Sequence, residues 1–572
     1  MNLYRLAQER LEREISLVPS REPGRLRVLL AYPNTYAVGM SNLGMHTVYR
    51  MLNAHPEVSC ERAFLPEDEE LVEYRRSKTP LFSVETQTDA SEFDVIALSA
   101  AFENDYPNIL TLLDLAGLPF RAVDRDDRHP LVLMGGATVS INPEPVAPFL
   151  DLCCLGEGEE LVEPLIDALL AADSNQGVLA QLMATPGFYV PSAYEPRYDA
   201  VSDGPPDFAG MQPLGSAPKV VTKVRAALEG RDRVAATAIL TPDTEFGDRI
   251  LVEVARGCTK GCRYCWVGYS ILPFRVHAAE DILAAVEPWK QHCDRVGLVA
   301  TALLDHPDIE AIASSLQQSG FRVHSPSLII STLREPLLDA VIASGQETIT
   351  VAPEAGSERM RELIMKNITN EEILDKARMI FRAGAVNLKN YIIIGLPGET
   401  EEDLQAIVDL GSAMRDIMVQ ECRHRGRIGT VTLSVNCLIP KPGTPLQWAE
   451  QISTAAYKRK LRWLKRRVGR IPNLVLDAMP PWSAEIQAVL SRGDRRVAEL
   501  LERWHETGNW RQALRDWTAA GNPSLEQLRQ PRVPGQPAPW DHLRIGPSTA
   551  ALENQWNKAM QIADSPTERR VP

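Results

Sequence analysis

Short apolar runs alternate with helix-length segments in the first part of the chain. Helical patterns follow the first two runs, at Asn42–Leu52 and Tyr106–Ala116. The four runs, each short enough for a buried strand, are Arg27–Ala31, Phe93–Ser99, Leu131–Met134 and Leu152–Leu155. Near-continuous apolar strands joined by helices are typical of a parallel sheet covered on both faces. We therefore expect residues 26–190 to form an α/β domain whose ligands bind at the carboxyl ends of the strands.

A second alternating region extends from residue 246 to about 450. Helical stretches such as Ala279–Trp289 and Glu371–Ala383 separate most of its strand candidates. Six strands are predicted: Ile250–Ala255, Val296–Ala302, Leu328–Thr332, Thr348–Ala352, Leu388–Ile394 and Thr430–Val435. Six strand–helix units are too few to close an eight-unit barrel, so the pattern predicts a partial, open (βα)6 barrel. Its functional residues are expected on the loops after the strands.

The remaining segments lack this alternation. Residues 1–25 contain a charged amphipathic helix pattern from Met1 to Val18, and residues 191–245 read as a linker or wrapping segment because Pro, Gly, Ser and Asp accumulate there. Beyond residue 450 strand signals vanish and helix patterns dominate. Residues 451–572 are therefore predicted to form a mainly helical extension.

Composition sets limits on the class of protein. The 572 residues are 44% hydrophobic and 24% charged, as in ordinary globular proteins. The net charge of −14 does not suit a general nucleic-acid binder, although a local basic patch could override it. The chain has no run of 18 apolar residues and no signal-peptide pattern, so we expect a cytoplasmic protein without a membrane partner.

Three of the nine cysteines fall close together in the segment RGCTKGCRYCW, directly after the first predicted barrel strand. Cys258, Cys262 and Cys265 have the spacing Cys-x3-Cys-x2-Cys, and thiolates are natural ligands of iron–sulfur clusters. Three ligands leave one iron of a 4Fe–4S cluster open to chelate S-adenosylmethionine (SAM) and to pass an electron into its sulfonium bond. The alternatives are a structural zinc site, for which His277 is the nearby imidazole, or three unrelated free thiols.

The cysteine motif, with Tyr264 before its last cysteine, resembles that of the radical SAM superfamily, as does the six-unit barrel. The segment APEAGS after the fourth strand resembles the acidic contact to the SAM ribose in this family, which implies that role for Glu354. The segment IGLPGE after the fifth strand resembles the turn that packs on adenine, which implies Gly395 and Pro397. Ala300–Leu303 stands where the family shows Gly-Gly-Glu, so no residue is assigned to the SAM amino group.

The first domain resembles the Rossmann-like cobalamin-binding domain that precedes the barrel in one large radical SAM class. The matching features are the strand that ends at Ser99, the turn Gly135-Gly136, Asn142–Glu144 and Gly156–Glu159. In that fold small residues leave room for the nucleotide tail. The resemblance therefore implies cobalamin contacts at Ser99, Gly135 and Gly136.

One position departs from other cobalamin proteins. Tyr36 stands where their axial-ligand histidine would be, so we expect that no imidazole holds the lower face of cobalt. The alternative is that this domain binds no cobalamin and only packs on the barrel or binds substrate.

The C-terminal region resembles the tail of a poorly characterised branch of the same class, through Ser491–Arg496 (SRGDRR) and Pro539–His542 (PWDH). Tyr457–Arg470 carries eight basic residues. A solvated helix face that pairs with the acidic remainder of the chain is the favoured interpretation of this run. A phosphate-contacting patch for RNA or a nucleotide is the alternative.

Together these resemblances imply a radical SAM enzyme with a 4Fe–4S cluster, SAM and cobalamin as cofactors. Cobalamin-dependent methyl transfer to an unactivated carbon is the leading hypothesis. The alternatives are a cobalamin-independent radical SAM enzyme that modifies RNA or a small metabolite, and a non-catalytic iron–sulfur sensor. The resemblance also implies an electron donor such as a reductase, ferredoxin or flavodoxin, and it leaves the substrate open between a small molecule and RNA.

Overall fold

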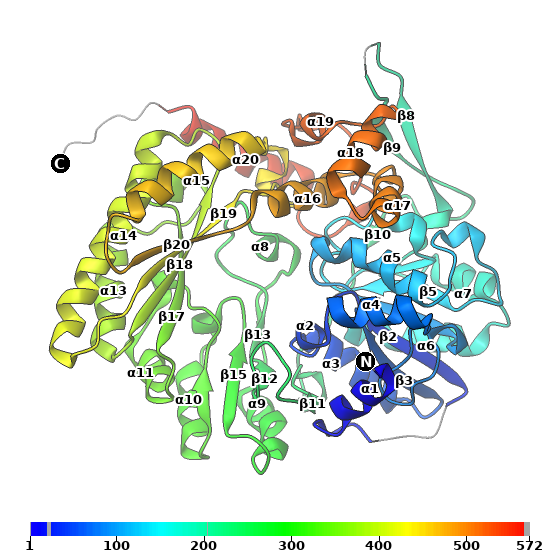
Figure 1. The fold of residues 1–572 in the computed structure, drawn as a ribbon, viewed down its shortest axis with the longest axis horizontal. Helices are drawn as coiled ribbons and strands as arrows, with labels where there is room; N and C mark the ends of the chain where they lie inside the picture. Colours follow the sequence, from blue (N-terminus) through cyan, green and yellow to red (C-terminus); the bar gives the residue numbers. More distant parts are fainter. Residues whose placement is uncertain (1, 20–23, 203, 566–572) are drawn as a thin grey trace.

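The computed structural model describes residues 2–19, 24–202 and 204–565 of the chain. Two α/β bodies lie side by side, with the first domain on the right of Figure 1 and the barrel-like domain on the left. Helices of the C-terminal region, coloured orange to red, run across the top of both bodies. In the described residues no helix is long and apolar enough to cross a bilayer.

The first domain is built on a six-stranded sheet in the order β3-β2-β4-β5-β6-β7. Neighbouring strands are parallel except for β7, which is antiparallel to β6. The strands are β2 (Leu26–Tyr32), β3 (Val58–Phe64), β4 (Val95–Ser99), β5 (Leu131–Gly135), β6 (Leu152–Cys154) and β7 (Phe188–Tyr189). Its helices include α3 (Leu43–Ala54), α4 (Asp68–Ser77), α5 (Tyr106–Leu115), α6 (Val162–Ala171) and α7 (Asn175–Leu182). The predicted parallel sheet is confirmed.

Strand β3 escaped the sequence analysis because charged residues interrupt its apolar pattern. Its Arg62 is buried and pairs with Glu14 at 2.7 Å and with Glu85 at 2.6 Å. A buried charge is tolerated where opposite charges and hydrogen bonds satisfy it, so this edge strand keeps polar side chains inside the fold.

The barrel-like domain consists of two parallel sheets, β12-β15-β16 and β17-β18-β19-β20, joined by a bridge between Leu328 and Val351. The strands are β12 (Ile250–Glu253), β15 (Arg295–Val299), β16 (Arg322–His324), β17 (Thr348–Glu354), β18 (Asn387–Ile394), β19 (Val431–Cys437) and β20 (Leu474–Ala478). Its helices include α9 (Ala279–Val286), α10 (Ile309–Gln318), α11 (Glu335–Ala343), α12 (Glu358–Leu363), α13 (Asn370–Ala383), α14 (Glu401–Cys422) and α15 (Thr454–Val468). Helices α10, α11, α13 and α14 lie outside the strands in Figure 1.

Two predictions about this domain are wrong. The third strand is β16, whereas Leu328 makes only an isolated bridge and Ile330–Thr332 form a 3-10 turn. Strand β20 lies in the region predicted to contain no strands, and it pairs in parallel with β19. Its burial alternates because it is an edge strand with one face exposed, so it lacks the continuous apolar run that marks a central strand.

The flanking segments wrap around both bodies. Helix α1 (Leu3–Leu11) ends well before Val18, and β1 (Ile15–Ser16) pairs with β11 (Ile239–Leu240), so the predicted longer helix is wrong. Part of the predicted 1–25 segment, residues 1 and 20–23, lies outside the described residues. Within the segment 191–245, β8 (Tyr194–Asp199) and β9 (Asp207–Pro213) form a hairpin, and β10 (Val221–Thr222) pairs with β21 (Leu543–Arg544).

The C-terminal region is mainly helical, as predicted. Its helices are α16 (Pro481–Arg492), α17 (Val497–Thr507), α18 (Trp510–Ala519), α19 (Leu525–Arg529) and α20 (Thr549–Ala563). Leu490, Leu501 and Trp517 share one apolar core with the strands of the first domain. Ala559 of α20 belongs instead to a cluster with Leu363 and Leu446 of the barrel-like domain. The extension therefore holds the two bodies together.

Candidate functional site

The three predicted ligand cysteines lie in the loop after β12 and the short β13 (Ala255–Arg256), before α8 (Val267–Ser270). Cys258 and Cys262 are buried, Cys265 is half-buried, and all three thiols are free. Arg263 anchors the loop, because its guanidinium donates to the carbonyls of Glu362 and Leu363 at 2.9 and 2.7 Å. The loop therefore has a defined shape with its thiols held inside the protein.

Glycine is required at Gly257 for this loop to turn. Its φ is +94°, and a Cβ there would lie 2.2 Å from the carbonyl oxygen of Ile271. Both the left-handed conformation and the close approach of backbone exclude a side chain. The loop that carries the cysteines thus folds back against the segment that follows them.

Glu354 ends β17 and contacts the cysteine loop directly. Its carboxylate accepts a hydrogen bond from Tyr264 Oη at 2.6 Å and pairs with Lys366 Nζ at 3.2 Å. The residue is buried, its φ is +69°, and the pairing of β17 with β18 is irregular at this point. Non-glycine residues in the left-handed region are uncommon and gather at functional sites. The structure thus brings the predicted SAM-ribose contact to the residue that precedes Cys265.

Gly395 and Pro397 form the turn after β18, the strand that neighbours β17. Gly395 has a φ of +84°, and a Cβ there would lie 2.8 Å from the side chain of Ile452. Its amide donates to Glu399, which pairs with Lys460 of α15 at 2.5 Å. Because adjacent parallel strands end at one edge of a sheet, this turn lies on the same rim as Glu354. Adenine packing on the turn stays a prediction.

His277 cannot complete a zinc site with the cysteines. The ring is fully buried, with Nδ1 at 3.1 Å from the carbonyl oxygen of Leu228 and Nε2 at 3.3 Å from Glu253. Among the described residues no three His, Cys, Asp or Glu side chains stand close enough to hold a single metal ion. In a four-iron cluster each cysteine binds a different iron, so its cysteines do not converge on one point.

The donor set of the loop fits a metal cluster. Burial raises the pKa of the Cys262 thiol to about 12. A thiol in such surroundings becomes a thiolate at neutral pH when a metal ion binds it. Three free thiols on one loop, two of them buried and one half-buried, are therefore suited to hold iron.

A cavity of about 440 Å³ lies between the first domain and the loop region of the barrel. Ser99, Gly135 and Gly136, at the carboxyl ends of β4 and β5, line one side of it, and Trp266 and Ile271 line the other. The predicted cobalamin positions and the residue after Cys265 thus border one space. A ligand in this cavity would touch both domains.

The two glycines differ in what the fold requires of them. Gly136 has a φ of +106°, and a Cβ there would lie 2.3 Å from the carbonyl oxygen of Ala100, so the backbone itself needs glycine. A Cβ on Gly135 would meet Cys154 Cβ at 3.7 Å, an ordinary contact. Only at Gly135 does the absent side chain serve chiefly to leave the cavity open.

Tyr36 does not line this cavity. Its hydroxyl donates to Glu14 at 2.5 Å, and burial, with Glu14 beside it, raises the pKa of the phenol. In the described part of the chain no histidine borders the cavity. The position where other cobalamin proteins place an axial histidine is used here to anchor the N-terminal segment.

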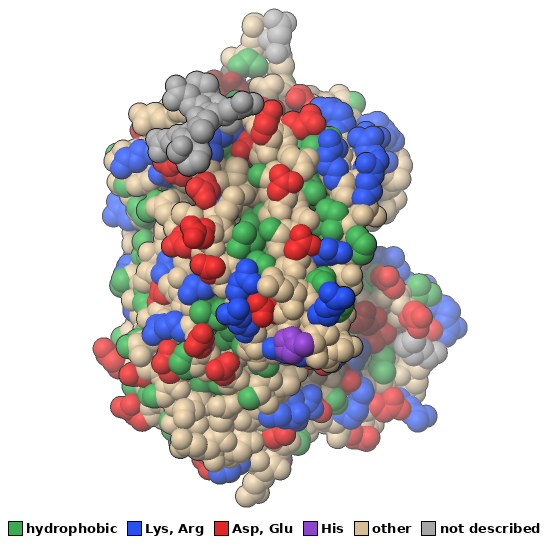
Figure 2. Space-filling view, turned by 90° about the vertical axis from the view of Figure 1, so that its left-hand side faces the viewer, with side chains coloured by type: hydrophobic (Ala, Val, Ile, Leu, Met, Phe, Trp, Pro, Cys, Tyr) green, Lys and Arg blue, Asp and Glu red, His purple; other side chains and the backbone are tan. Residues whose placement is uncertain are grey.

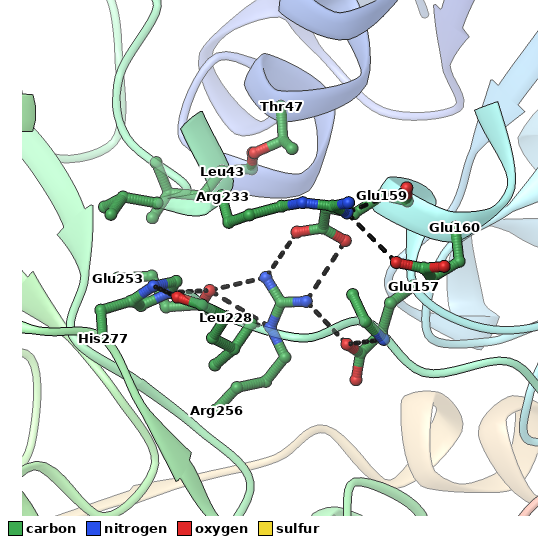
Figure 3. A network of polar contacts seen from close by, with 12 residues as sticks. Leu43, Thr47, Glu157, Glu159, Glu160, Leu228, Arg233, Glu253, Arg256 and His277 are labelled. Carbon is green, nitrogen blue, oxygen red and sulfur yellow. Dashed lines mark hydrogen bonds and ion pairs between the residues drawn. The ribbon is translucent and has the colours of Figure 1, made fainter. Parts of the chain in front are cut away.

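A buried ionic network joins the first domain to the cysteine loop (Figure 3). Arg256, two residues before Cys258, pairs with Glu157 at 2.9 Å, Glu159 at 2.8 Å and Glu253 at 2.7 Å. Burial lowers the pKa of Arg256, but the carboxylates of Glu253 and Glu159 more than offset this and raise it above its usual value. All four side chains border the cavity. The segment Gly156–Glu159 was part of the predicted resemblance, but no local pattern indicated a partner for its carboxylates.

Lys223 was missed because no motif surrounds it in the wrapping segment. It borders both this cavity and an adjoining pocket of about 530 Å³, whose other walls include Tyr269, Ser270 and Arg544. Lys223 Nζ donates to the carbonyl of Ser270 at 2.9 Å and lies 5.4 Å from the ring centre of Trp266. Burial lowers the pKa of Lys223 to about 8. The lysine is thus held against the residues that follow Cys265.

Comparison with known proteins decides the family. A model described as the radical SAM superfamily matches residues 252–411, and a model described as the N-terminal part of radical SAM proteins matches residues 44–191. The chain belongs to the radical SAM superfamily. Radical SAM proteins use a 4Fe–4S cluster and SAM, so the cysteine loop and Glu354 lie in the part of the chain where these cofactors are expected.

The similar proteins have varied names. The radical SAM chain is 24% identical over 480 residues to the uncharacterized protein MJ0966 of Methanocaldococcus jannaschii. This match covers 83% of this chain and 90% of that protein. It is 23% identical over 449 residues to tRNA-2-methylthio-N(6)-dimethylallyladenosine synthase of Thermus thermophilus. That match covers 76% of this chain and 85% of the synthase. Among solved structures it matches the cobalamin-dependent SAM radical enzyme OxsB with aqua-cobalamin, at 13% identity and a TM-score of 0.43, over 84% of this chain and 67% of that one.

Proposed function

We propose that the protein is a cobalamin-dependent radical SAM enzyme that transfers a methyl group to an unactivated carbon. The observation that carries this proposal is the cavity bordered on one side by the strand ends at Ser99, Gly135 and Gly136 and on the other by Trp266. Ligands of open parallel sheets bind at the carboxyl ends of the strands. A corrinoid held there would adjoin the residue that follows Cys265.

Each cofactor has a set of residues in this proposal. Cys258, Cys262 and Cys265 hold the cluster, and Glu354, with Gly395 and Pro397, holds SAM. A bound 4Fe–4S cluster supplies an electron that cleaves SAM, and a bound cobalamin supplies a methyl group. The electron reaches the cluster from a donor of the reductase, ferredoxin or flavodoxin type.

The residues of the chain position these groups. Tyr264 and Lys366 hold the Glu354 carboxylate in a fixed orientation, so that it can accept hydrogen bonds from ribose hydroxyls. The carboxylates around Arg256 tie the cysteine loop to the first domain. Reacting groups must lie about 3–3.5 Å apart for fast reaction, and rigid ties between the two domains favour such a fixed geometry.

The experiment uses full-length protein produced with cobalamin and reconstituted anaerobically with iron and sulfide. About four irons and one corrinoid per chain are expected. With a strong reductant and SAM, release of S-adenosylhomocysteine together with 5′-deoxyadenosine is expected for methyl transfer. Replacing all three cysteines with Ala should remove the iron. Retention of iron in that variant, or stoichiometric zinc in the wild-type site, would contradict the assignment of the three cysteines to a 4Fe–4S cluster.

Gly135 tests the corrinoid separately from the iron. Gly135→Leu should expel the corrinoid while iron content stays at the wild-type value, because its side chain fills the cavity without a backbone clash. Gly135→Ala is the matched control and should retain most of the corrinoid. Gly136→Leu is a poorer test, because it also strains the backbone at a φ of +106°.

A second candidate is a radical SAM enzyme without cobalamin that modifies RNA. Its support is the similarity over 76% of this chain to a protein named as a tRNA-modifying synthase. If wild-type protein retains no corrinoid under any loading condition but still cleaves SAM, methyl transfer is abandoned and this candidate replaces it. Absence of SAM cleavage would leave only the iron–sulfur sensor.

A further inference from the structure

Helix α15 exposes a row of basic side chains that lack acidic partners among the described residues. Of the eight basic residues in Tyr457–Arg470, Lys460 pairs with Glu399 and Arg467 approaches Glu401 at 3.8 Å. The other six are exposed, and across residues 2–19, 24–202 and 204–565 no carboxylate lies within ion-pair distance of them. These six are Lys458, Arg459, Arg462, Lys465, Arg466 and Arg470. The predicted pairing with the acidic remainder of the chain is therefore wrong for most of this helix.

The spacing of these residues places their charges on one stripe. Lys458, Arg462 and Lys465 follow the i, i+4, i+7 pattern of a single helix face, and Arg459 and Arg466 flank it. Like charges at this spacing destabilise a helix. In a chain with a net charge of −14, the stripe stands out as a local positive field that an anionic partner would relieve.

The stripe borders a groove. A surface cavity of about 430 Å³ is lined by Lys458, Arg459, Arg462 and Lys465 of α15 and by Pro481 at the start of α16. The next residue, Trp482, has 58% of its surface exposed. Figure 2 looks onto the barrel side of the molecule and shows Lys and Arg side chains gathered at the upper right, at the height of α15 in Figure 1.

The groove lies at the end of the barrel that carries the candidate site. Helix α15 follows the carboxyl end of β19, and Pro481 follows the carboxyl end of β20. On the inner face of α15, Lys460 pairs with Glu399, which accepts the amide hydrogen of Gly395. The same helix thus supports the predicted adenine turn on one face and presents the basic stripe on the other.

We propose that this groove binds the phosphate backbone of RNA. From Lys458 to Lys465 the helix rises about 10 Å, which matches about three nucleotides of a stacked strand. An exposed tryptophan beside a basic groove is the combination that single-stranded nucleic acids occupy, with bases stacked on the ring. Trp482 follows Pro481 of the groove wall and supplies that ring in this proposal. RNA would then be the substrate class of the proposed enzyme. RNA binding itself does not depend on the proposed function, whereas modification of the bound RNA does.

The test measures binding of a short, fluorescein-labelled, mixed-sequence single-stranded RNA to the reconstituted full-length protein by fluorescence anisotropy. Lys458→Gln/Arg462→Gln should weaken binding and reduce the slope of log K against log salt by about 1.4, since each phosphate contact on a single strand contributes about 0.7. The matched control is Arg511→Gln/Arg515→Gln on α18, where two exposed arginines have the same i, i+4 spacing. The control should bind like wild type.

Trp482→Ala separates stacking from charge. It should weaken RNA binding at least about fivefold, because stacking on an aromatic ring contributes about 1–3 kcal/mol per base, and it should leave the salt slope unchanged. Equal binding by wild type and Lys458→Gln/Arg462→Gln, or loss of binding in the α18 control, overturns the proposal. The proposal is also overturned if the protein binds phosphatidylserine vesicles as tightly as RNA and Trp482→Ala does not weaken that binding. That result would assign the groove to an anionic membrane surface.

Iron content and SAM cleavage are measured on the same variants. Normal SAM cleavage by wild-type protein that does not bind RNA contradicts this inference and leaves the proposed function intact. RNA binding without SAM cleavage contradicts the proposed function and leaves this inference intact. Melting temperatures close to wild type are expected for all these exposed substitutions, so loss of binding cannot be attributed to unfolding.

Discussion

The first domain meets the rest of the chain at two buried junctions with similar chemistry and different surroundings. At the barrel junction, Arg256 is surrounded by Glu157, Glu159 and Glu253 (Figure 3). At the C-terminal junction the central group is instead a carboxylate, that of Glu144, and the groups around it donate hydrogen bonds to it. Both junctions join residues far apart in the chain.

The C-terminal junction is closed. Glu144 is fully buried and accepts hydrogen bonds from Arg495 Nε at 2.7 Å and Tyr189 Oη at 2.5 Å. Burial raises the pKa of Glu144, but Arg495 and His542 more than offset this and hold it at about 2. Asn142 adds hydrogen bonds to backbone carbonyls of the SRGDRR segment. None of these side chains borders the two cavities between the domains.

The barrel junction is open, because its charged groups border a cavity. A closed network can only hold parts of the fold together, whereas an open one can also meet a ligand. This difference assigns the two C-terminal motifs of the sequence to structure, since Arg495 and His542 belong to the closed junction. It assigns Arg256 and its carboxylates to the neighbourhood of the candidate site.

The largest expected effect is on the closed junction. Arg495→Met should lower the free energy of unfolding by about 3–5 kcal/mol, because it leaves the Glu144 charge buried without its main partner. Denaturant unfolding followed by circular dichroism measures this. The matched control, Arg503→Met, removes a half-exposed i, i+4 pair with Glu499 and should change stability by less than about 1 kcal/mol. Equal effects of the two substitutions would show that burial does not set the strength of this junction.

Glu354, a buried carboxylate at the predicted SAM site, should behave differently from Glu144. Glu354→Gln should weaken SAM binding by about 1.5–3 kcal/mol, the contribution of a hydrogen bond to a charged group. Equilibrium dialysis of SAM against reconstituted protein measures the change. Glu371→Gln, at an exposed carboxylate in the first turn of α13, is the control and should bind SAM normally. Unchanged affinity of Glu354→Gln would remove Glu354 from the site.

The open junction should tolerate loss of its arginine better than the closed one. Arg256→Met should lower the free energy of unfolding by about 1–3 kcal/mol, because Glu157 keeps Arg275 at 2.6 Å, Glu253 keeps His277 at 3.3 Å, and the cavity admits water to Glu159. SAM cleavage should fall while iron content stays the same, since the cysteines remain. A loss of stability as large as that of Arg495→Met would erase the distinction between the junctions.

A pH dependence is also expected at the open junction. Burial lowers the pKa of Lys223 from 10.5 to about 8, so the unfolded chain binds the proton more tightly than the folded one. Between pH 8 and 10.5 the stability of the wild-type protein should therefore increase as pH rises. Below pH 8 Lys223 is charged in both states, and the full cost of burying its charge lowers stability. Lys223→Met should relieve that penalty at pH 7, with the relief shrinking from pH 8 to 10.5.

The control for this comparison is Lys219→Met, at an exposed lysine of the same segment. Unfolding midpoints of both variants and wild type are measured across the pH range. The difference between Lys219→Met and wild type should stay constant. A constant difference for Lys223→Met as well would show that its proton is bound equally in the folded and unfolded states.

The sequence by itself determined the parts of this protein that depend on neighbours along the chain. Cys258, Cys262 and Cys265 lie on one loop because eight residues of backbone hold them there, and the central strands follow from continuous apolar runs. Strands β3 and β20 were missed, since edge strands carry polar residues on an exposed face or in buried ion pairs. Local patterns reveal a strand by its continuous apolar run, and both strands lack one, because β20 exposes one face and β3 buries charged side chains.

Only the tertiary structure decided which distant residues share the site. Arg256 and Glu157 are 99 positions apart, and Lys223 reaches the cysteine loop from a segment without any motif. It also showed that Gly136 is required by its backbone whereas Gly135 leaves space, and that most cations of α15 have no acidic partner in the described part of the chain. Such contacts form because chain segments pack by burying apolar surface. Whether the charges brought together in this way are paired depends on the tertiary geometry, which residue spacing along the chain does not predict.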